Sequence, residues 1–132
     1  KVVDHYQPEV IILAGYMRIL SADFISKYFG KILNIHPSLL PKFPGLNTHQ
    51  RAIDAFEKKH GASVHFVTEE LDGGPVIAQE FVNIDSTDNA QTLAKKVLDK
   101  EHDLYPKTIH WYTQGRLKLV DKNTATLDKK TL

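Results

Sequence analysis

An asparagine and a histidine, two residues apart, occupy the apolar stretch "ILNIH" at residues 32–36, just before the loop "PSLLPKFPG". Because strand side chains alternate between two faces, we expect Asn34 and His36 on one side and Leu33 and Ile35 in the core on the other. A neutral hydrogen-bond donor and a titratable imidazole then emerge together at the carboxyl end of a parallel strand, where ligands bind in open α/β sheets. The alternative is structural, with Asn34 capping a turn and His36 a buried histidine whose hydrogen bonds are satisfied.

Asp72, in the stretch "EELDGGPVI", is a second candidate. It lies directly before a Gly-Gly-Pro turn, where the backbone bends sharply or lets another group approach closely. If the turn brings this carboxylate within hydrogen-bonding distance of His36, the carboxylate favours the cationic imidazole and holds the ring, as an acid–base pair requires. The alternative is a local turn in which Asp72 accepts hydrogen bonds from its own backbone amides.

Residues 15–20, "GYMRIL", are a third candidate, because the exposed backbone of a loop after a buried strand can recognise a flat heterocycle. The alternative is that the apolar side chains there fill the core and Arg18 is a solvated charge.

Other chemistries have less support in the sequence. No HxxxH or HExxH pattern joins the histidines in the middle of the chain into a zinc site, namely His36, His49, His60 and His65. Ser38 is close to His36, but the GxSxG turn of serine hydrolases is missing from these residues. Neither GxGxxG nor GxxxxGK[ST], the loops that hold phosphates, occurs in them.

The apolar pattern predicts the elements that position these groups. Buried strands are expected at Glu9–Gly15 and Lys31–Ile35, joined by a helix that Ser21 caps and Gly30 ends. A short helix between two such strands is typical of a parallel crossover, so the predicted class is α/β.

The second half of the chain predicts a hairpin and a long helix. We expect a helix over Thr48–Lys59 with an apolar face of Ala52, Ile53 and Phe56, and strands at Ala62–Thr68 and Val76–Ile84 that pair antiparallel. A cap at Ser86 or Asp88 begins a helix that continues to Gln114, with Leu93, Val97, Leu104, Ile109 and Trp111 as its buried stripe. Pro106 should kink or divide that helix, and residues 121–132 form a polar surface tail.

Composition narrows the classes of protein. The chain has 132 residues, of which 42% are hydrophobic and 25% charged, as in an ordinary globular domain. Its formal charge of +1 is too small to attract the chain as a whole to nucleic acid or to a membrane surface. Cysteine is missing from these residues, which excludes disulfides and thiolate chemistry within them and fits a reducing compartment. Because the chain opens on Lys1 rather than on methionine, we expect further sequence upstream.

Three segments, "LAGYMRILS", "LNIHPSLLPKFPGL" and "SVHFVTEELDGGPVI", resemble the glycinamide ribonucleotide formyltransferases, folate-dependent enzymes of purine biosynthesis. The resemblance runs from about Pro8 to Leu119. The block NxHPSLLP also occurs, in looser form, in methionyl-tRNA formyltransferases and formyltetrahydrofolate hydrolases. The resemblance as a whole implies a cytoplasmic protein with a Rossmann-like formyltransferase fold. That fold has a mostly parallel sheet with one antiparallel strand and flanking helices. Residues 1–120 would be the C-terminal folate-binding and catalytic part of the domain.

The resemblance also implies roles for individual residues. The catalytic set would be Asn34, His36 and Asp72. The cleft for 10-formyltetrahydrofolate would consist of Met17, Arg18, Ile19, Leu20, Thr68, Glu69, Glu70 and Leu71. The glycinamide part of the acceptor would contact Ile35, Pro37 and Glu101, with Glu101 near its amine. The Leu40–Pro41 bond is expected to be cis.

The implied reaction needs two small-molecule substrates and neither a metal nor a covalent intermediate. The acceptor amine attacks the formyl carbon on N10 of the folate, while Asn34 and a cationic His36, held by Asp72, donate hydrogen bonds to the formyl oxygen. Asp72 would organise the base or water that moves the amine proton to N10. Family members often carry histidine where this chain has Asn47, which cannot titrate, so any pH-linked ordering of the loop would be altered.

The family's first strands and its glycine-containing phosphate loop are not among these residues. We therefore expect the chain alone to be inactive or weak, to expose a sheet edge, and to need its N-terminal half, from the same gene product or a second polypeptide. Three alternatives remain at this stage: hydrolysis of the same folate, formylation of a different amine, and an inactive folate-binding or assembly fragment.

Overall fold

The computed structural model describes residues 10–14, 21–70 and 73–132. Within these residues four strands form one sheet in the order β1 (Ile11–Ala14), β2 (Ile32–His36), β3 (Lys59–Phe66) and β4 (Val76–Asn83). β1 and β2 are parallel, whereas β3 is antiparallel to both β2 and β4. Three strands therefore run the same way and β3 is the one antiparallel member, which confirms the predicted α/β fold.

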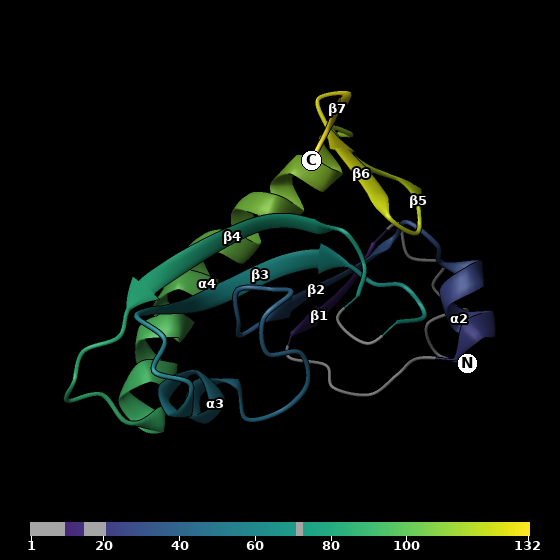
Figure 1. Ribbon diagram of the computed structural model, residues 1–132. Helices are drawn as coiled ribbons and strands as arrows, with labels where there is room; N and C mark the ends of the chain where they lie inside the picture. The colour runs from purple at the N-terminus through teal and green to yellow at the C-terminus, as the bar shows by residue number, and fades with distance from the viewer. Residues whose placement is uncertain (1–9, 15–20, 71–72) are drawn as a thin grey trace.

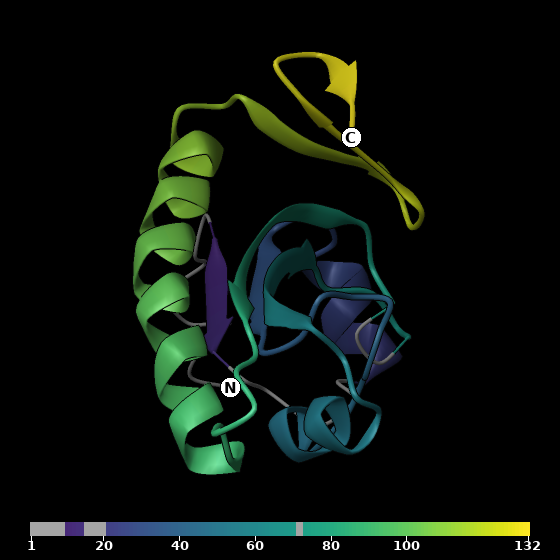
Figure 2. The same cartoon turned by 60° about the vertical axis from the view of Figure 1, so that its left-hand side comes forward.

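Helices cover both faces of this sheet. The long helix α4 (Ala90–Thr113) lies along one face and α2 (Ala22–Lys27) lies on the other (Figure 2). The short helix α3 (Thr48–Asp54) contacts α4 near its first turns (Figure 1). The main core lies between α4 and the sheet and contains Leu33, Ile35, Val64, Phe66, Leu93, Val97 and Leu104. Alternation along β2 thus places Leu33 and Ile35 in the core, as predicted.

The helix caps follow local hydrogen bonding. Ser21 caps α2 as predicted, because its hydroxyl oxygen accepts from the Phe24 amide at 3.2 Å. The cap of α4 is Asn89, so the prediction of Ser86 or Asp88 was wrong. Asn89 and Thr92 accept hydrogen bonds from each other's backbone amides in a reciprocal capping box. The Asp88 carboxylate instead accepts from Lys96 at 2.6 Å.

α3 is shorter than the predicted helix over Thr48–Lys59. It ends at Asp54, and Phe56 takes a left-handed backbone conformation with φ of 56°. Lys59 already pairs with Asn83 in the β3–β4 ladder. The last residue of the predicted helix is therefore part of β3. Phe56, which was predicted on the apolar face of the helix, is 90% exposed.

The end of the chain holds two further differences. α4 continues through Pro106 as one helix rather than dividing there. Beyond it, β5 (Leu117–Asp121), β6 (Thr124–Leu127) and β7 (Lys130–Thr131) form a small antiparallel sheet. The sequence did not predict these strands, although most residues of 121–132 are exposed. Ala125 is buried in the main core, and the half-buried Leu127 packs against that core.

No helix in residues 10–14, 21–70 and 73–132 has the length and apolar character to cross a membrane. β1 is one of the two edge strands of the sheet that these residues form, and Ile12 on it is 44% exposed.

Candidate active site

Asn34 and His36 lie together on the face of β2 turned away from the main core. Their residues are 2% and 0% exposed, so both polar side chains are removed from water. The antiparallel register sets Asn34 opposite His65 and His36 opposite Ser63 on β3. Four polar side chains from two neighbouring strands therefore share one buried surface.

His65 holds the amide of Asn34. The amide nitrogen lies 3.2 Å from His65 Nε2, and His65 Nδ1 lies 2.9 Å from the Phe66 carbonyl oxygen. Because a carbonyl only accepts, Nδ1 carries the proton and Nε2 is the acceptor for the Asn34 amide. This fixes the direction in which the Asn34 donor group points.

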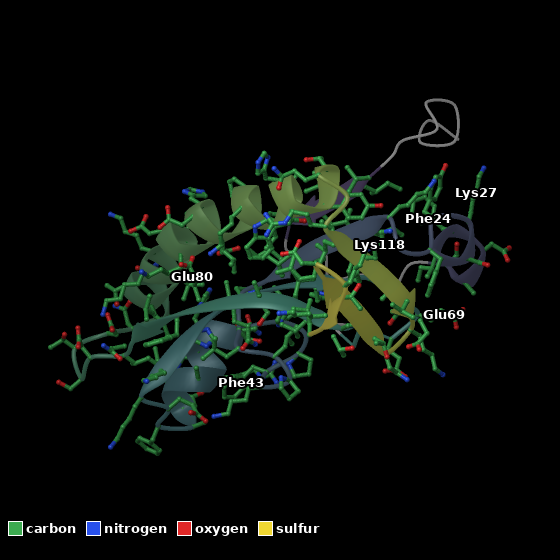
Figure 3. The ribbon with its side chains drawn as sticks, turned by 90° about the horizontal axis from the view of Figure 1, so that it is seen from above. Phe24, Lys27, Phe43, Glu69, Glu80 and Lys118 are labelled. Carbon is green, nitrogen blue, oxygen red and sulfur yellow. The ribbon has the colours of Figure 1, made fainter. Side chains whose placement is uncertain are left out.

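His36 is anchored to the loop that follows β2. Its Nε2–H donates to the Phe43 carbonyl oxygen at 2.8 Å. The charge of His36 therefore depends on whether Nδ1 is also protonated. Phe43 takes a left-handed conformation, and its ring lies 5.4 Å from the Arg51 guanidinium of α3. Figure 3 shows Phe43 on the side of the sheet away from α4, whereas Glu80 lies beside α4.

Ser63 fixes the first half of the same loop. Its hydroxyl donates to the Ser38 carbonyl at 2.7 Å and accepts from the Leu40 amide at 3.0 Å. Gln79 of β4 donates to the Leu40 carbonyl at 2.8 Å and to the Ser63 hydroxyl at 2.9 Å. The Leu40–Pro41 bond in this loop is cis, as expected. The loop that carries the Phe43 carbonyl is thus bound to the sheet at several points.

His65 and Ser63 are site residues that sequence analysis missed. His65 was considered only as a zinc ligand, and Ser63 not at all. The alternation of "ASVHF" carried the signal, because it puts Ser63 and His65 on one face of a strand and apolar residues on the other. What the pattern lacked was the pairing of that strand with β2.

Asp72 lies outside the described residues, so its predicted contact with His36 stays a prediction. Its neighbours on the C-terminal side lie against the end of β3. The Phe66 amide donates to the Pro75 carbonyl at 3.1 Å. A Cβ on Gly74 would lie 1.8 Å from the Phe66 carbonyl oxygen, so glycine is needed for this close approach. The predicted bend is therefore present at Gly74, two residues before β4 begins.

Three predicted folate-cleft residues line one pocket. Thr68, Glu69 and Glu70 border a cavity of about 320 Å³ together with Ile25, Ser26, Phe29, Lys122 and Asn123. Phe24 of α2 and Glu69 lie at the same end of the molecule (Figure 3). Lys122 and Asn123, from the turn between β5 and β6, were not predicted. Met17, Arg18, Ile19, Leu20 and Leu71 lie outside the described residues.

Two of the three predicted acceptor residues share a second cavity. Ile35 and Glu101 line a space of about 380 Å³ with Leu98, His102, Tyr105, Pro106 and Ile109. Burial raises the pKa of Glu101. Pro37 does not line this cavity; its carbonyl accepts from the Thr48 hydroxyl on the other side of the strand.

Two more histidines lie near His36. His60 Nε2 and His49 Nδ1 are 3.1 Å apart. Burial, and then the charges of His49 and His36, lower the pKa of His60 to about 4. Burial, and then His36, also lower the pKa of His49. Across the described ranges, no group of three or more His, Cys, Asp or Glu side chains is arranged to hold a metal ion.

Comparison with known proteins decides the family. The family model described as formyl transferase matches residues 1–109, well over half of the chain. The chain belongs to the formyl transferase family.

Individual members are also similar to this formyl transferase chain. It is 52% identical over 130 residues to the phosphoribosylglycinamide formyltransferase of Escherichia coli K12, covering 98% of the chain and 61% of that protein. The solved phosphoribosylglycinamide formyltransferase of Coxiella burnetii matches with a TM-score of 0.92 and 48% identity, over 99% of the chain and 61% of that structure. A formyltetrahydrofolate deformylase from Pseudomonas syringae pv. tomato matches with a TM-score of 0.87 and 32% identity, over 96% of the chain and 42% of that structure. The chain thus spans about three fifths of the first relatives' length.

The lowered pKa values of His49 and His60 predict how stability depends on pH. Both histidines bind a proton more readily in the unfolded chain, so the free energy of unfolding should fall as the pH drops from 6.5 toward about 4. Urea unfolding at several pH values measures this slope. His60→Gln, which cannot titrate, should flatten the slope, while His110→Gln at an exposed position should keep it. A His60→Gln slope equal to that of the unmodified protein would show that this histidine pair does not set the dependence.

Proposed function

We propose that this formyl transferase chain carries the reaction centre for transfer of a formyl group from 10-formyltetrahydrofolate to the amine of glycinamide ribonucleotide. The observation that carries the proposal is the buried pair at the end of β2, in which Asn34 presents an oriented donor beside His36. The 52% identity to a phosphoribosylglycinamide formyltransferase supports this choice of acceptor. The absence of cysteine from the chain agrees with a reducing cytoplasm as its place of action.

The reaction proceeds by addition and elimination at the formyl carbon. The acceptor nitrogen forms a bond to that carbon, and negative charge develops on the formyl oxygen. The bond from carbon to N10 then breaks, the amine proton passes to N10, and formylated acceptor and tetrahydrofolate leave. Asn34 stabilises the developing oxyanion through its amide N–H, which is already oriented by His65 and needs no rearrangement.

His36 contributes chiefly through its charge. Because Nε2–H is engaged by the Phe43 carbonyl, a second proton on Nδ1 makes the ring cationic. If Asp72 accepts from Nδ1, the ring acts on the oxyanion through its positive charge; otherwise Nδ1–H is a direct donor. In either arrangement the carboxylate of Asp72 favours the cation and organises the base or water that moves the amine proton.

We assign the folate to the cavity beside α2 and the acceptor to the neighbourhood of Glu101. The cavity beside α2 offers Ile25 and Phe29 as apolar surface and the segment Thr68–Glu70 as backbone and side-chain polar groups, which suits the pterin end of the folate. We place Met17, Arg18, Ile19, Leu20 and Leu71 in the same cleft. The acceptor amine approaches Glu101, and Ile35 and Pro37 contact the glycinamide part.

Hydrolysis of the same folate is the second candidate, because a formyltetrahydrofolate deformylase is among the similar structures. Both reactions need an oxyanion donor, so the distinction lies in the attacking group. Formate released at an undiminished rate in the absence of any amine acceptor would favour the hydrolase.

The chain alone is predicted to transfer formyl groups very slowly. It spans 61% of the Escherichia coli relative, and we place the acceptor's phosphate site in the part of the protein beyond it. β1 would there pair with a further strand, since Ile12 on this edge is 44% exposed. Transfer should be measured with residues 1–132 and with the full gene product. Near-normal turnover by residues 1–132 would refute the division of the site.

Loss of either donor should slow transfer in the full gene product. Asn34→Ala removes the oriented amide and His36→Ala removes the charge, and each should lower kcat by about 10²–10³. His110→Ala, at an exposed position on α4, is the matched control and should retain full activity. Titration with a 10-formyl folate analogue tests whether the variants still bind. Variants that bind the analogue and retain kcat would remove Asn34 and His36 from the mechanism.

A further inference from the structure

Tyr105 connects α4 to both strands of the parallel pair. Its hydroxyl lies within hydrogen-bonding distance of the carbonyl oxygens of Leu13 on β1 and Leu33 on β2, the latter at 3.0 Å. In the register of these strands, Ile12 lies opposite Leu33 and Leu13 opposite Asn34. One side chain from the covering helix therefore contacts the backbone of both strands at the level of the proposed oxyanion donor.

The hydroxyl acts there as a donor. A carbonyl oxygen can only accept, and a phenol has one proton, so Tyr105 donates to one carbonyl at a time while both stay within reach. Burial raises the pKa of Tyr105, which keeps the phenol protonated through neutral and mildly alkaline pH. The contact therefore persists over the range in which the protein would work.

Each of the two carbonyls belongs to a segment with a proposed role. Leu33 directly precedes Asn34. Leu13 is the last residue but one of β1, after which the chain leads to the proposed folate segment 17–20. The Tyr105 hydroxyl therefore holds the peptide that leads into Asn34 beside β1. Figure 2 shows α4 lying along β1.

We propose that Tyr105 is a positioning residue for formyl transfer: its hydroxyl holds the Leu33 carbonyl beside β1 and thereby fixes the position of the Asn34 amide. This rests on the proposed function and adds to it a residue that touches neither substrate through its hydroxyl. The same helix carries Glu101 one turn earlier, and both residues line the cavity beside Ile35. α4 thus positions the acceptor side and the strand pair together.

The test compares two phenol deletions in the full gene product. Tyr105→Phe removes the strand contact, whereas Tyr112→Phe removes a hydroxyl that donates from the same helix to the Gly30 carbonyl at 3.1 Å, before β2 begins. Active sites are counted by titration with a non-transferable 10-formyl folate analogue, and kcat is expressed per site, so that the folded fraction does not enter. Tyr105→Phe should lose about tenfold to a hundredfold in kcat per site, the loss expected for a small misplacement. Its KM for the folate should change by less than about threefold, because ground-state binding is kept.

Tyr112→Phe should keep its kcat per site within about twofold, which a purely structural loss of one hydroxyl would allow. The proposal is overturned if Tyr105→Phe matches the unmodified protein per site, if both variants lose kcat equally, or if Tyr105→Phe alone stops binding the analogue. If the unmodified protein binds the analogue but transfers no formyl group, the proposed function fails and takes this inference with it. Normal transfer by the unmodified protein with an unaffected Tyr105→Phe would reject the role of Tyr105 alone.

Discussion

The orientation of one buried amide governs the chemistry available to this protein. The Phe66 carbonyl fixes the proton of His65 on Nδ1, and the bare Nε2 then requires the Asn34 amide nitrogen to face it. A flipped amide would set its oxygen against the lone pair of Nε2 in a site closed to water, which costs about 1–3 kcal/mol for the lost hydrogen bond. The donor proposed to act on the formyl oxygen is thus oriented before any substrate arrives.

The side chains on the two faces of β2 make different contacts. On the face away from α4, His36 is tied to the Phe43 carbonyl, and Ser63 ties the same loop to β3. On the opposite face, Ile35 packs toward α4, whose Glu101 and Tyr105 line the adjoining cavity. We propose that the two substrates meet at the carboxyl end of β2, where the acceptor amine can reach the formyl group beside Asn34. The rigidity of β2 comes from pairing on both edges and from burial of all five residues.

Sequence patterns predicted the α/β fold and the shared face of Asn34 and His36, because both depend on local periodicity. Alternation alone set Asn34 and His36 on one face, and the hairpin of β3 and β4 followed from its apolar pattern and turn. His65 could not be assigned to Asn34, since their contact depends on a register between strands 31 residues apart. The cap of α4 was also ambiguous, because Ser86, Asp88 and Asn89 are similar capping residues. The reciprocal backbone hydrogen bonds with Thr92 identify Asn89 as the cap. β5–β7 are only two to five residues long, which is too short for a clear alternating pattern.

The most direct test of this account is a crystal structure of the full gene product with glycinamide ribonucleotide and a non-transferable 10-formyl folate analogue. The formyl oxygen should lie within about 3.2 Å of the Asn34 amide nitrogen, with the Asp72 carboxylate directed at the His36 ring. A formyl group bound on the α4 side of β2, or Asp72 turned to solvent more than about 8 Å from His36 with no bridging water, would contradict it.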